Sequence, residues 1–504
     1  MADVYLESGA WLGAAFVLLV VGNIVHQLLP RRASEPPAVF HWIPFVGNAV
    51  EYGLDPYRFF KRQQKKHGDI FTFTLLGRKI TCYFGLDGNE FILNGKHQDL
   101  NAEEIYSPLT TPVFGSDVVY DCPNSKLMEQ KKFVKFGLTQ KSLESYVPLI
   151  SAEVIDYIRA SGVFSGQGGL VNVPKAMAEI TIFTAGRALQ GDEVREKLTN
   201  EFASLYHDLD MGFSPINFLL PQAPLPHNRK RDQAHAKMRS IYTSIIEKRR
   251  SGDSEKGSDM IWNLMNCKYK SGQPVPDKEI AHMMITLLMA GQHTSSSAIS
   301  WIVLHLASRP DICDELYEEQ VSNLAKDGKL PPLEYVDIGK LPLLHNVVKE
   351  TLRCHSSIHS VMRKVKRPMP VPGTPYIVQP DKVLLASPLV TALDEEHFPN
   401  GEEWEPHRWD ADTRNEDDES DDGEERFISR GTRSPYLPFG GGRHRCIGEK
   451  FAYVNLGAIT ATLVRNFRFE TVSGDKGVPK TDYTSLFSRP VQPAMARWER
   501  RAKV

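Results

Sequence analysis

From about residue 55 onward, apolar residues recur mostly at the three- and four-residue spacing of amphipathic helices, with little strand-like alternation. This spacing predicts helices at residues 125–160, 175–205, 230–250, 278–307, 311–325 and 341–354. Two β-prone runs within residues 71–85 meet at Gly77 and Arg78 and predict a hairpin. A second small β region is expected at residues 361–386. We therefore expect a mainly α protein with small β-sheets, an α+β fold.

The amino-terminal segment differs from the rest because residues 11–29 carry no formal charge and are mostly apolar. Roughly 20 residues are needed to cross a bilayer, so this segment is just long enough. Arg31 and Arg32 follow it, and the positive flank of a span stays cytosolic. We expect a transmembrane helix within residues 1–30, with the rest of the chain in the cytosol. A cleaved secretory signal is disfavoured by the acidic early flank and the lack of a small-residue cleavage site.

The chain after this segment has two parts. Residues 31–54 contain Pro36, Pro37 and Pro44, and because proline fixes φ they predict a stiff connector. No linker or repeat divides residues 55–504, so one large domain is expected there. Its acidic run, Glu416–Glu425, cannot bury apolar area and is expected to form a mobile surface loop.

Charge and cysteine content limit the possible partners. The formal net charge is −2, and because binding to nucleic acid needs clustered positive charge, this near-neutral balance gives no reason to expect a nucleic-acid partner. Short basic clusters at residues 61–66 and 229–231 are either solvated helix faces or contacts for anionic lipid or an acidic electron donor. The six cysteines include no C-x-x-C pair, which disfavours a disulfide scaffold and suits a reducing compartment. Five of them are expected to be buried, and Cys446 is the exception.

The segment 278–307 is apolar over most of its circumference, which predicts a buried helix roughly 45 Å long. A polar block at residues 291–297 interrupts it. Glycine in a helix interior costs about 1 kcal/mol relative to alanine, so Gly291 suggests a place where the helix opens or is closely approached. The alternative is a polar patch whose Ser and Thr side chains bond back to helix carbonyls.

The stretch PFGGGRHRCIGEKF, residues 438–451, places Cys446 ahead of an apolar helical run at 447–467. Its three consecutive glycines let the backbone pass close to a flat group. A thiol at a helix start meets free amides and the positive end of the helix dipole, which stabilise the thiolate. Such a thiolate binds haem iron and favours O–O cleavage. The competing interpretation is a buried free cysteine beside a glycine turn. A zinc site is disfavoured because His444 and Cys446 have no companion ligand pair.

This stretch resembles the haem-binding motif of the cytochrome P-450 superfamily, F-x-x-G-x-[RH]-x-C-x-G. Phe439, Gly442, His444 and Cys446 occupy its defined positions. The resemblance implies that Cys446 is the ligand of the iron and that the other three lie against the haem.

Two further superfamily motifs occur in the expected order. Glu350 and Arg353 match E-x-x-R, an i, i+3 pair on one helix face, and Arg408 matches the third member of that ion cluster. The resemblance implies that Glu350 bridges both arginines in a structural role, since a buried charge must be paired.

Residues 290–294, AGQHT, resemble the oxygen-activation motif [AG]-G-x-[DE]-T, with His293 where the superfamily usually has an acid. The sequence G-Q-H-T-S resembles that of the sterol 14α-demethylases. The resemblance implies that Thr294 is the hydroxyl near bound oxygen. His293 is the expected relay or hydrogen-bond partner, because the pKa of histidine lies near working pH.

The likeness to sterol 14α-demethylases extends over roughly residues 35–500 and is greatest to fungal members. It implies further contacts of two kinds. Those with the haem, including its carboxylates, are Tyr106, Tyr120, Lys131, Arg363 and His444. Those with the substrate are Thr110, Phe114, Phe213, His359, Ser360 and Leu486.

The resemblance implies a haem-thiolate monooxygenase whose catalytic domain covers residues 55–504 and carries haem b. Its expected reaction is removal of the 14α-methyl group of lanosterol or eburicol as formate, in ergosterol biosynthesis. Expected partners are the sterol, NADPH–cytochrome P-450 reductase, cytochrome b5 as a further electron donor, and the endoplasmic reticulum bilayer. The alternatives are another steroid or xenobiotic monooxygenase of the superfamily and, less favoured, a non-catalytic haem- or sterol-binding protein.

Overall fold

The computed structural model describes residues 2–197, 200–218, 220–252, 257, 259–410, 431–472 and 477–502. The chain divides into two compact units. The sheet unit consists of Met1–Ile105, His359–Ala392 and Gly431–His444, and the helical unit consists of Tyr106–Ile358, Leu393–Arg430 and Arg445–Val504. The acidic run Glu416–Glu425 lies outside the described residues, so the surface loop stays a prediction.

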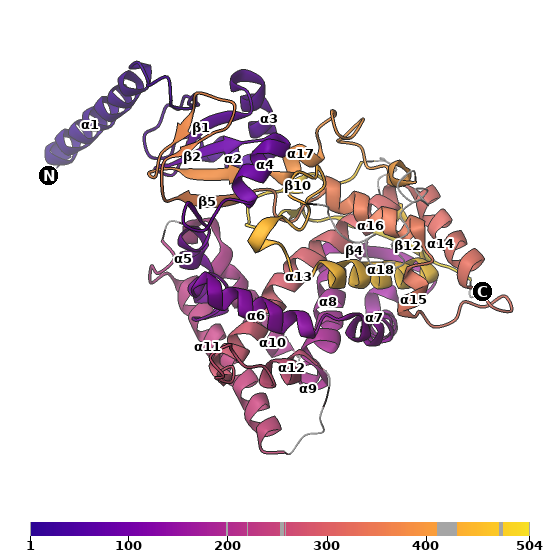
Figure 1. The fold of residues 1–504 in the computed structure, drawn as a ribbon. Coiled ribbons are helices and arrows are strands. Elements are labelled where there is room, and N and C mark those ends of the chain that lie inside the picture. Colours follow the sequence, from indigo (N-terminus) through magenta and orange to yellow (C-terminus); the bar gives the residue numbers. More distant parts are fainter. Residues whose placement is uncertain are drawn as a thin grey trace. The chain divides into compact units, whose positions relative to one another are not determined.

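The sheet unit is built on a five-stranded sheet in the order β1-β2-β8-β5-β3 (Figure 1). The predicted hairpin is confirmed, because β1 (Ile70–Leu75) and β2 (Arg78–Tyr83) pair antiparallel. Leu76 and Gly77 both have positive φ, as a tight two-residue hairpin turn requires. The second β region is also confirmed. The remaining strands are β3 (Leu100–Asn101), β5 (Val361–Val365), β8 (Val383–Ala386) and the separate pair β6 (Met369–Pro370) and β7 (Ile377–Val378).

The helices of this unit that accompany the sheet are α2 (Ala49–Leu54), α3 (Pro56–His67), α4 (Gly85–Leu93) and α17 (Pro388–Ala392). α3 begins where the Asp55 side chain accepts a hydrogen bond from the Arg58 N–H at 2.9 Å. It buries Phe59 and Phe60, and the Phe59 ring lies 5.2 Å from the ring of Phe73 on β1. These aromatic contacts fix α3 against the hairpin.

A helix, α1 (Ala2–Leu28), occupies the position of the predicted anchor. Near its end, Asn23 and Gln27 donate to the His41 carbonyl at 3.0 and 2.8 Å. The connector then pairs with β1, since the Val39 N–H donates to the Thr72 carbonyl at 2.8 Å. Within the part of the chain that the structure describes, none of the helices has the length and hydropathy that a membrane crossing requires.

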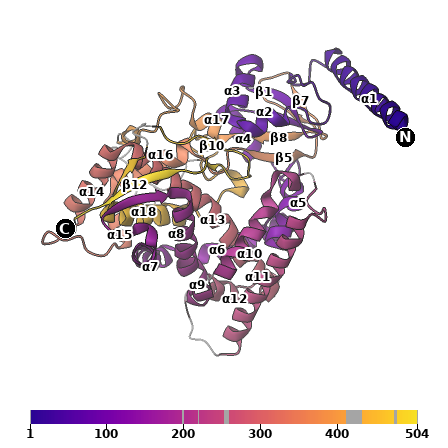
Figure 2. The same cartoon turned by 180° about the vertical axis from the view of Figure 1, so that it is seen from behind.

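The helical unit is organised around α13 (Asp277–Ser308), which packs against α8 (Val173–Ala185), α11 (Pro226–Arg250) and α18 (Glu449–Asn466) (Figure 2). The other α-helices that the structure describes here are α5 (Glu103–Phe114, begun in the sheet unit), α6 (Asn124–Phe136), α7 (Gln140–Ala160), α9 (Asp192–Lys197), α10 (Asn200–Asp210), α12 (Met260–Met265), α14 (Pro310–Leu324), α15 (Tyr335–Ile338) and α16 (Pro342–Cys354). The strands are β4 (Gly168–Asn172), β9 (Phe467–Thr471) and β12 (Met495–Arg500) in one sheet, and β10 (Thr481–Asp482) with β11 (Arg489–Pro490) in another.

Two predicted helical stretches are divided. The stretch 125–160 becomes α6 and α7, because the Thr139 hydroxyl accepts from the Ser142 N–H at 3.4 Å and starts a new helix. The stretch 175–205 breaks at Gly191, whose φ of +93° leaves the helical region. By contrast, α13 is continuous, so the interpretation that it opens at Gly291 is wrong.

Candidate active site

Cys446 precedes α18 in the helical unit, as the sequence predicted. Gly448 stands at the N-cap of α18, and its N–H hydrogen-bonds the Cys446 sulfur. The Cys446 side chain is exposed, although α18 is largely buried. Of the other cysteines, Cys82, Cys267 and Cys313 are buried as expected, whereas Cys122 and Cys354 are only half-buried.

Two cations lie near the Cys446 sulfur. Lys131 on α6 donates to the Arg445 carbonyl at 2.9 Å. Burial lowers the pKa of Lys131 to about 8, and the neighbouring Cys446 opposes this shift. Although part of its surface is accessible, the Cys446 thiol is closely surrounded by protein atoms, and this desolvation raises its pKa, against the Gly448 amide and the charges of Lys131 and Arg445. An exposed sulfur with an amide and two cations beside it fits a thiolate ligand of iron. Among the described residues, no three His, Cys, Asp or Glu side chains form a metal site, so a zinc protein gains no support.

The glycines ahead of the cysteine are required by the protein's own backbone. Gly442 has a φ of +64°, and a Cβ there would lie 2.1 Å from the Leu93 carbonyl oxygen at the end of α4. A Cβ at Gly441 would lie 2.7 Å from the Thr432 side chain. Contacts inside the sheet unit therefore account for glycine at positions 441 and 442. A Cβ at Gly440 would meet nothing within 4 Å, and the close approach of a flat group to this backbone stays a prediction.

His444 has protein partners that the sequence did not indicate. Its Nε2 lies 3.7 Å from Glu103 Oε1 and accepts a hydrogen bond from Arg443 Nε at 3.2 Å. Arg443 is held in turn by the Gly95 carbonyl at 2.7 Å. Phe439 is half-buried in the same segment. The roles of Phe439, Gly442 and His444 towards haem stay predictions.

The predicted ion cluster is confirmed in the helical unit. The Glu350 carboxylate accepts from Arg353 at 2.7 and 2.9 Å and from Arg408 at 2.9 Å. Trp409 Nε1 donates to the same carboxylate at 2.9 Å. Burial alone would raise the pKa of Glu350, but the hydrogen bonds and charge of Arg353, helped by Arg408, hold it below its ordinary value. The cluster is structural, because each of its charged side chains has its hydrogen-bond partners and counter-charge within the protein.

The middle of α13 is left uncovered at the predicted oxygen-activation motif. Ala290 is exposed, and a Cβ at Gly291 would meet nothing within 4 Å. The Thr294 hydroxyl donates to the Ala290 carbonyl at 2.9 Å, and Ser296 likewise donates to the His293 carbonyl at 3.2 Å. Thr294 and Ser296 therefore bond back to their own helix, as the alternative predicted, whereas Ser297 donates to the Ser488 carbonyl at 2.7 Å. The patch also borders open space at Ala290 and Gly291.

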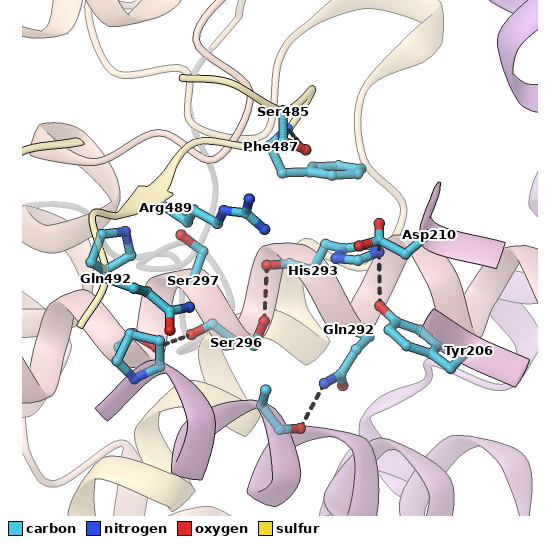
Figure 3. Close-up of a pocket in the computed structure, with 14 residues that line it drawn as sticks. Tyr206, Asp210, Gln292, His293, Ser296, Ser297, Ser485, Phe487, Arg489 and Gln492 are labelled. Atoms are coloured by element: carbon cyan, nitrogen blue, oxygen red, sulfur yellow. Dashed lines mark hydrogen bonds and ion pairs between the residues drawn. The ribbon is translucent and has the colours of Figure 1, made fainter. Parts of the chain in front are cut away.

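His293 is held by side chains of α10 and the C-terminal loop (Figure 3). Its Nε2 lies 2.8 Å from the Tyr206 hydroxyl and 3.0 Å from Asp210 Oδ1. The Phe487 ring stacks on the imidazole at 4.8 Å. Burial would raise the pKa of Asp210, but the hydrogen bond and charge of His293, with the charge of Arg489, lower it. Asp210 is therefore an ionised partner of the imidazole at neutral pH.

In the helical unit, the residues predicted to contact haem or substrate lie close to one another in two groups. The Tyr106 and Tyr120 rings lie 5.1 Å apart, and Thr110 donates to the Tyr106 carbonyl at 2.9 Å. The Phe114 and Phe213 rings meet edge to face at 5.7 Å. Leu486 packs against the same apolar cluster as Phe114 and Phe213. Their contact with substrate or haem stays a prediction.

Three further predicted residues of the sheet unit lie at or just before β5: His359, Ser360 and Arg363. Arg363 is buried and donates to the Met362 carbonyl at 2.8 Å. His359 Nδ1 lies 2.9 Å from the Ser360 hydroxyl, and burial lowers the pKa of His359 to about 4. The imidazole is therefore neutral at physiological pH.

Sequence reasoning missed Tyr206, Asp210 and Phe487. Each comes from an element distant from α13 in the chain: Tyr206, for example, is 87 residues from His293. The one available signal was the polar run YHDLD at residues 206–210, within an otherwise helical stretch.

The fold and the cysteine site define the class of protein. Residues 37–498 match the family model described as Cytochrome P450, and the chain belongs to the cytochrome P450 family. A solved structure described as retinoic acid bound cyanobacterial CYP120A1 has the same fold, with a TM-score of 0.76 at 20% identity over 94% of this chain and 100% of that chain. Haem is the cofactor that this family implies.

The particular branch is that of the fungal sterol 14-alpha demethylases. The chain is 67% identical to a protein of Gibberella zeae of that name, over 98% of both chains. It is 64% identical to a sterol 14-alpha demethylase of Aspergillus fumigatus over 98% of both chains. It is 60% identical to an eburicol 14-alpha-demethylase of Penicillium italicum over 99% of both chains. The resemblance noted in the sequence is thereby confirmed.

Proposed function

We propose that this protein removes the 14α-methyl group of lanosterol or eburicol as formate, in ergosterol biosynthesis. The observation that carries the proposal is the 67% identity to a sterol 14-alpha demethylase over 98% of both chains. The Cys446 geometry and the uncovered middle of α13 support it, because a monooxygenase needs a thiolate ligand and space for oxygen and substrate.

Cys446 would hold haem b, which when bound supplies the activation of dioxygen for three successive oxidations. Desolvation raises the pKa of the Cys446 thiol, and the Gly448 amide and the nearby Lys131 act in the opposite direction, towards the anionic sulfur. Lys131, Arg363 and His444 are the groups proposed to pair with the haem carboxylates, since buried anions need charge-assisted partners.

The apolar side chains of the helical unit orient the sterol in this proposal. Phe114, Phe213 and Leu486 share one apolar cluster, and a rigid polycyclic substrate gains binding energy from such a surface. The paired rings of Tyr106 and Tyr120 add a second aromatic wall. His359 and Ser360 are the proposed polar contacts. Holding the methyl group in one position is the main catalytic task of the protein.

Thr294 and His293 have the proton-handling roles. Each oxidation consumes one dioxygen, two electrons and two protons and releases one water when the substrate is hydroxylated. Thr294 provides a hydroxyl at the uncovered face of α13. The contacts of His293 with Tyr206 and Asp210 fix its ring for the exchange of protons.

Reconstitution tests this proposal. Purified protein, NADPH–cytochrome P-450 reductase and NADPH should convert lanosterol or eburicol to the 14-demethylated sterol and one formate per turnover. A type I spectral shift with these sterols, but not with bile acids or drugs, would separate the proposal from another monooxygenase. Tight sterol binding without formate would instead favour a haem- or sterol-binding protein.

We also propose that α1 attaches the protein to the endoplasmic reticulum membrane, with the catalytic domain in the cytosol. Exposed apolar side chains on α1 support this, among them Phe16, Leu18 and Val21 at 54%, 71% and 49% exposure. Deletion of residues 1–30 should abolish flotation with liposomes. A glycosylation acceptor placed before Asp3 would be modified only if the segment crosses the bilayer. Cytochrome b5 is a further electron donor in this proposal, tested by its effect on turnover.

A further inference from the structure

The last turn of α5 carries Phe114, which the proposed function places against the sterol, but its own helix holds it weakly. Pro108 and Pro112 both lie inside α5. Proline has no N–H, so the helix lacks a backbone hydrogen bond at each of these positions. The orientation of Phe114, whose ring meets the ring of Phe213 at 5.7 Å, therefore depends on contacts from other elements.

Two histidines from separate helices hold the backbone on either side of Gly115. His282 of α13 lies with its Nδ1 2.8 Å from the Ser116 carbonyl oxygen. His235 of α11 hydrogen-bonds the backbone of Phe114. The two imidazole rings lie side by side, with their centroids 5.2 Å apart. Two adjacent side chains therefore join the end of α5 to α11 and α13.

Gly115 allows the chain to approach His282 closely. The glycine has a φ of +98°, and a Cβ there would lie 2.4 Å from Cγ of the imidazole. Its N–H donates to the Thr111 carbonyl at 2.9 Å, so this backbone is also tied to α5. His282 is only 1% exposed. The imidazole is thus enclosed against the backbone that it holds, which only glycine permits at this position.

Both imidazoles are neutral at physiological pH. Burial lowers the pKa of His282, and burial together with the charge of His282 lowers the pKa of His235 to about 4. A neutral imidazole has one N–H, and a carbonyl oxygen can only accept. The N–H of His282 is therefore on Nδ1 and donates to Ser116, so the hydrogen bond forms without burying a charge.

We propose that His282 and His235 are positioning residues that fix Phe114 for contact with the sterol and thereby set sterol affinity. The inference rests on the proposed function, in which Phe114 contacts the substrate. With the backbone held on both sides of Gly115, the Phe114 ring keeps its place beside Phe213 before the sterol binds. Binding then requires no ordering of this segment, and the affinity is higher for that reason.

His282→Leu tests the proposal, because it removes the hydrogen-bond donor and keeps a side chain of similar size. The spectral Kd and the KM for lanosterol and eburicol should rise about tenfold, the effect of losing one hydrogen bond. The kcat at saturating sterol should stay within about twofold of wild type, as expected when binding alone is weakened. His282→Gln keeps a donor and should restore most of the affinity. A wild-type Kd in His282→Leu would overturn the proposal.

A double-mutant cycle separates the positioning of Phe114 from a general loss of structure. In a Phe114→Ala background, His282→Leu should have no further effect on the sterol Kd, because the ring that it positions is gone. Equal losses of affinity in the two backgrounds would overturn the proposal. Gln233→Leu is the matched control at an exposed position of α11 and should have the wild-type Kd.

His235→Leu applies the same test from α11 if His282→Leu does not fold. Hydrogen–deuterium exchange at residues 110–118 should be faster in either variant than in the wild type, and unchanged exchange in the folded variant would overturn the proposal. A wild type that binds sterol but releases no formate would overturn the proposed function alone. The sterol Kd and the exchange rate would still decide the role of the two histidines.

Discussion

Nε2 of His293 and Oδ1 of Asp210 lie 3.0 Å apart, where the superfamily motif would place an acid in the position of the histidine. The pKa of Asp210 is lowered, so its carboxylate is ionised at neutral pH and has no proton to share. The hydrogen between the two atoms therefore belongs to Nε2. The acid at this place is therefore Asp210 of α10, and His293 occupies the α13 position that the motif usually gives to an acid.

Asp210→Asn tests this arrangement. The amide cannot stabilise a protonated imidazole, so turnover should fall by roughly 10²-fold while the spectral Kd for sterol stays the same. Peroxide release per NADPH should rise. Asp208→Asn is the matched control on the same helix and should keep wild-type turnover. A wild-type rate in Asp210→Asn would show that the ion pair has no part in proton transfer.

Cys446→Ala removes the proposed iron ligand. The reduced protein should lose the carbon monoxide difference band that a thiolate ligand gives. Cys122→Ala is the control: it changes a half-buried cysteine in the loop before α6 and should retain the carbon monoxide difference band. Persistence of the band in Cys446→Ala would assign the ligand to another residue.

Glu350→Gln should destabilise the protein by about 3–5 kcal/mol, because Arg353 and Arg408 lose their buried counter-charge. The folded-state pKa of Glu350 lies below its ordinary value of 4.5, so its stabilising effect is present above pH 4.5 and is lost as pH falls through the lowered value. The stability gap between wild type and variant, measured by urea unfolding, should therefore narrow in acid. Glu395→Gln, at an exposed position, should have the same free energy of unfolding as the wild type at every pH. A gap that persists unchanged in acid would contradict the ion-pair explanation.

A comparison of Gly442→Ala with Gly440→Ala separates the energetic cost of an unfavourable φ from the cost of a steric clash with the backbone. Both glycines have φ near +65°, at +64° and +67°, so each alanine should cost about 1–2 kcal/mol in conformational strain. Only at Gly442 does the new Cβ meet a backbone atom, the Leu93 carbonyl oxygen at 2.1 Å. Thermal denaturation should therefore show a clearly larger loss for Gly442→Ala. Equal losses of thermal stability in the two variants would mean that the backbone at Leu93 can shift at little energetic cost.

Sequence reasoning succeeded where the spacing along one element determines the geometry. Glu350 and Arg353 are an i, i+3 pair, so a single helix brings them together, and the motif order then supplied Arg408. The hairpin followed in the same way from two β-prone runs around Gly77. The start of a helix after Cys446 was predictable from the apolar run behind it.

The remaining features depend on contacts between distant segments. No local pattern shows that α10 brings Tyr206 and Asp210 to His293, because that contact is decided by how helices cross. The contact that excludes a Cβ at position 442 is with a carbonyl oxygen at the end of α4, which spacing within the loop does not reveal. The break at Thr139 was also missed, because the apolar period continues through it and only a cap marks the new helix.

α1 is attached to the connector by the side chains of Asn23 and Gln27, which donate to the His41 carbonyl. The connector is attached to β1 by the hydrogen bond from the Val39 N–H to the Thr72 carbonyl. His41, which accepts the side-chain bonds from α1, and Val39, which donates the backbone bond to β1, both lie between Pro37 and Pro44 in the stiff connector. The orientation of α1 is therefore coupled through two short steps to the first strand of the sheet unit.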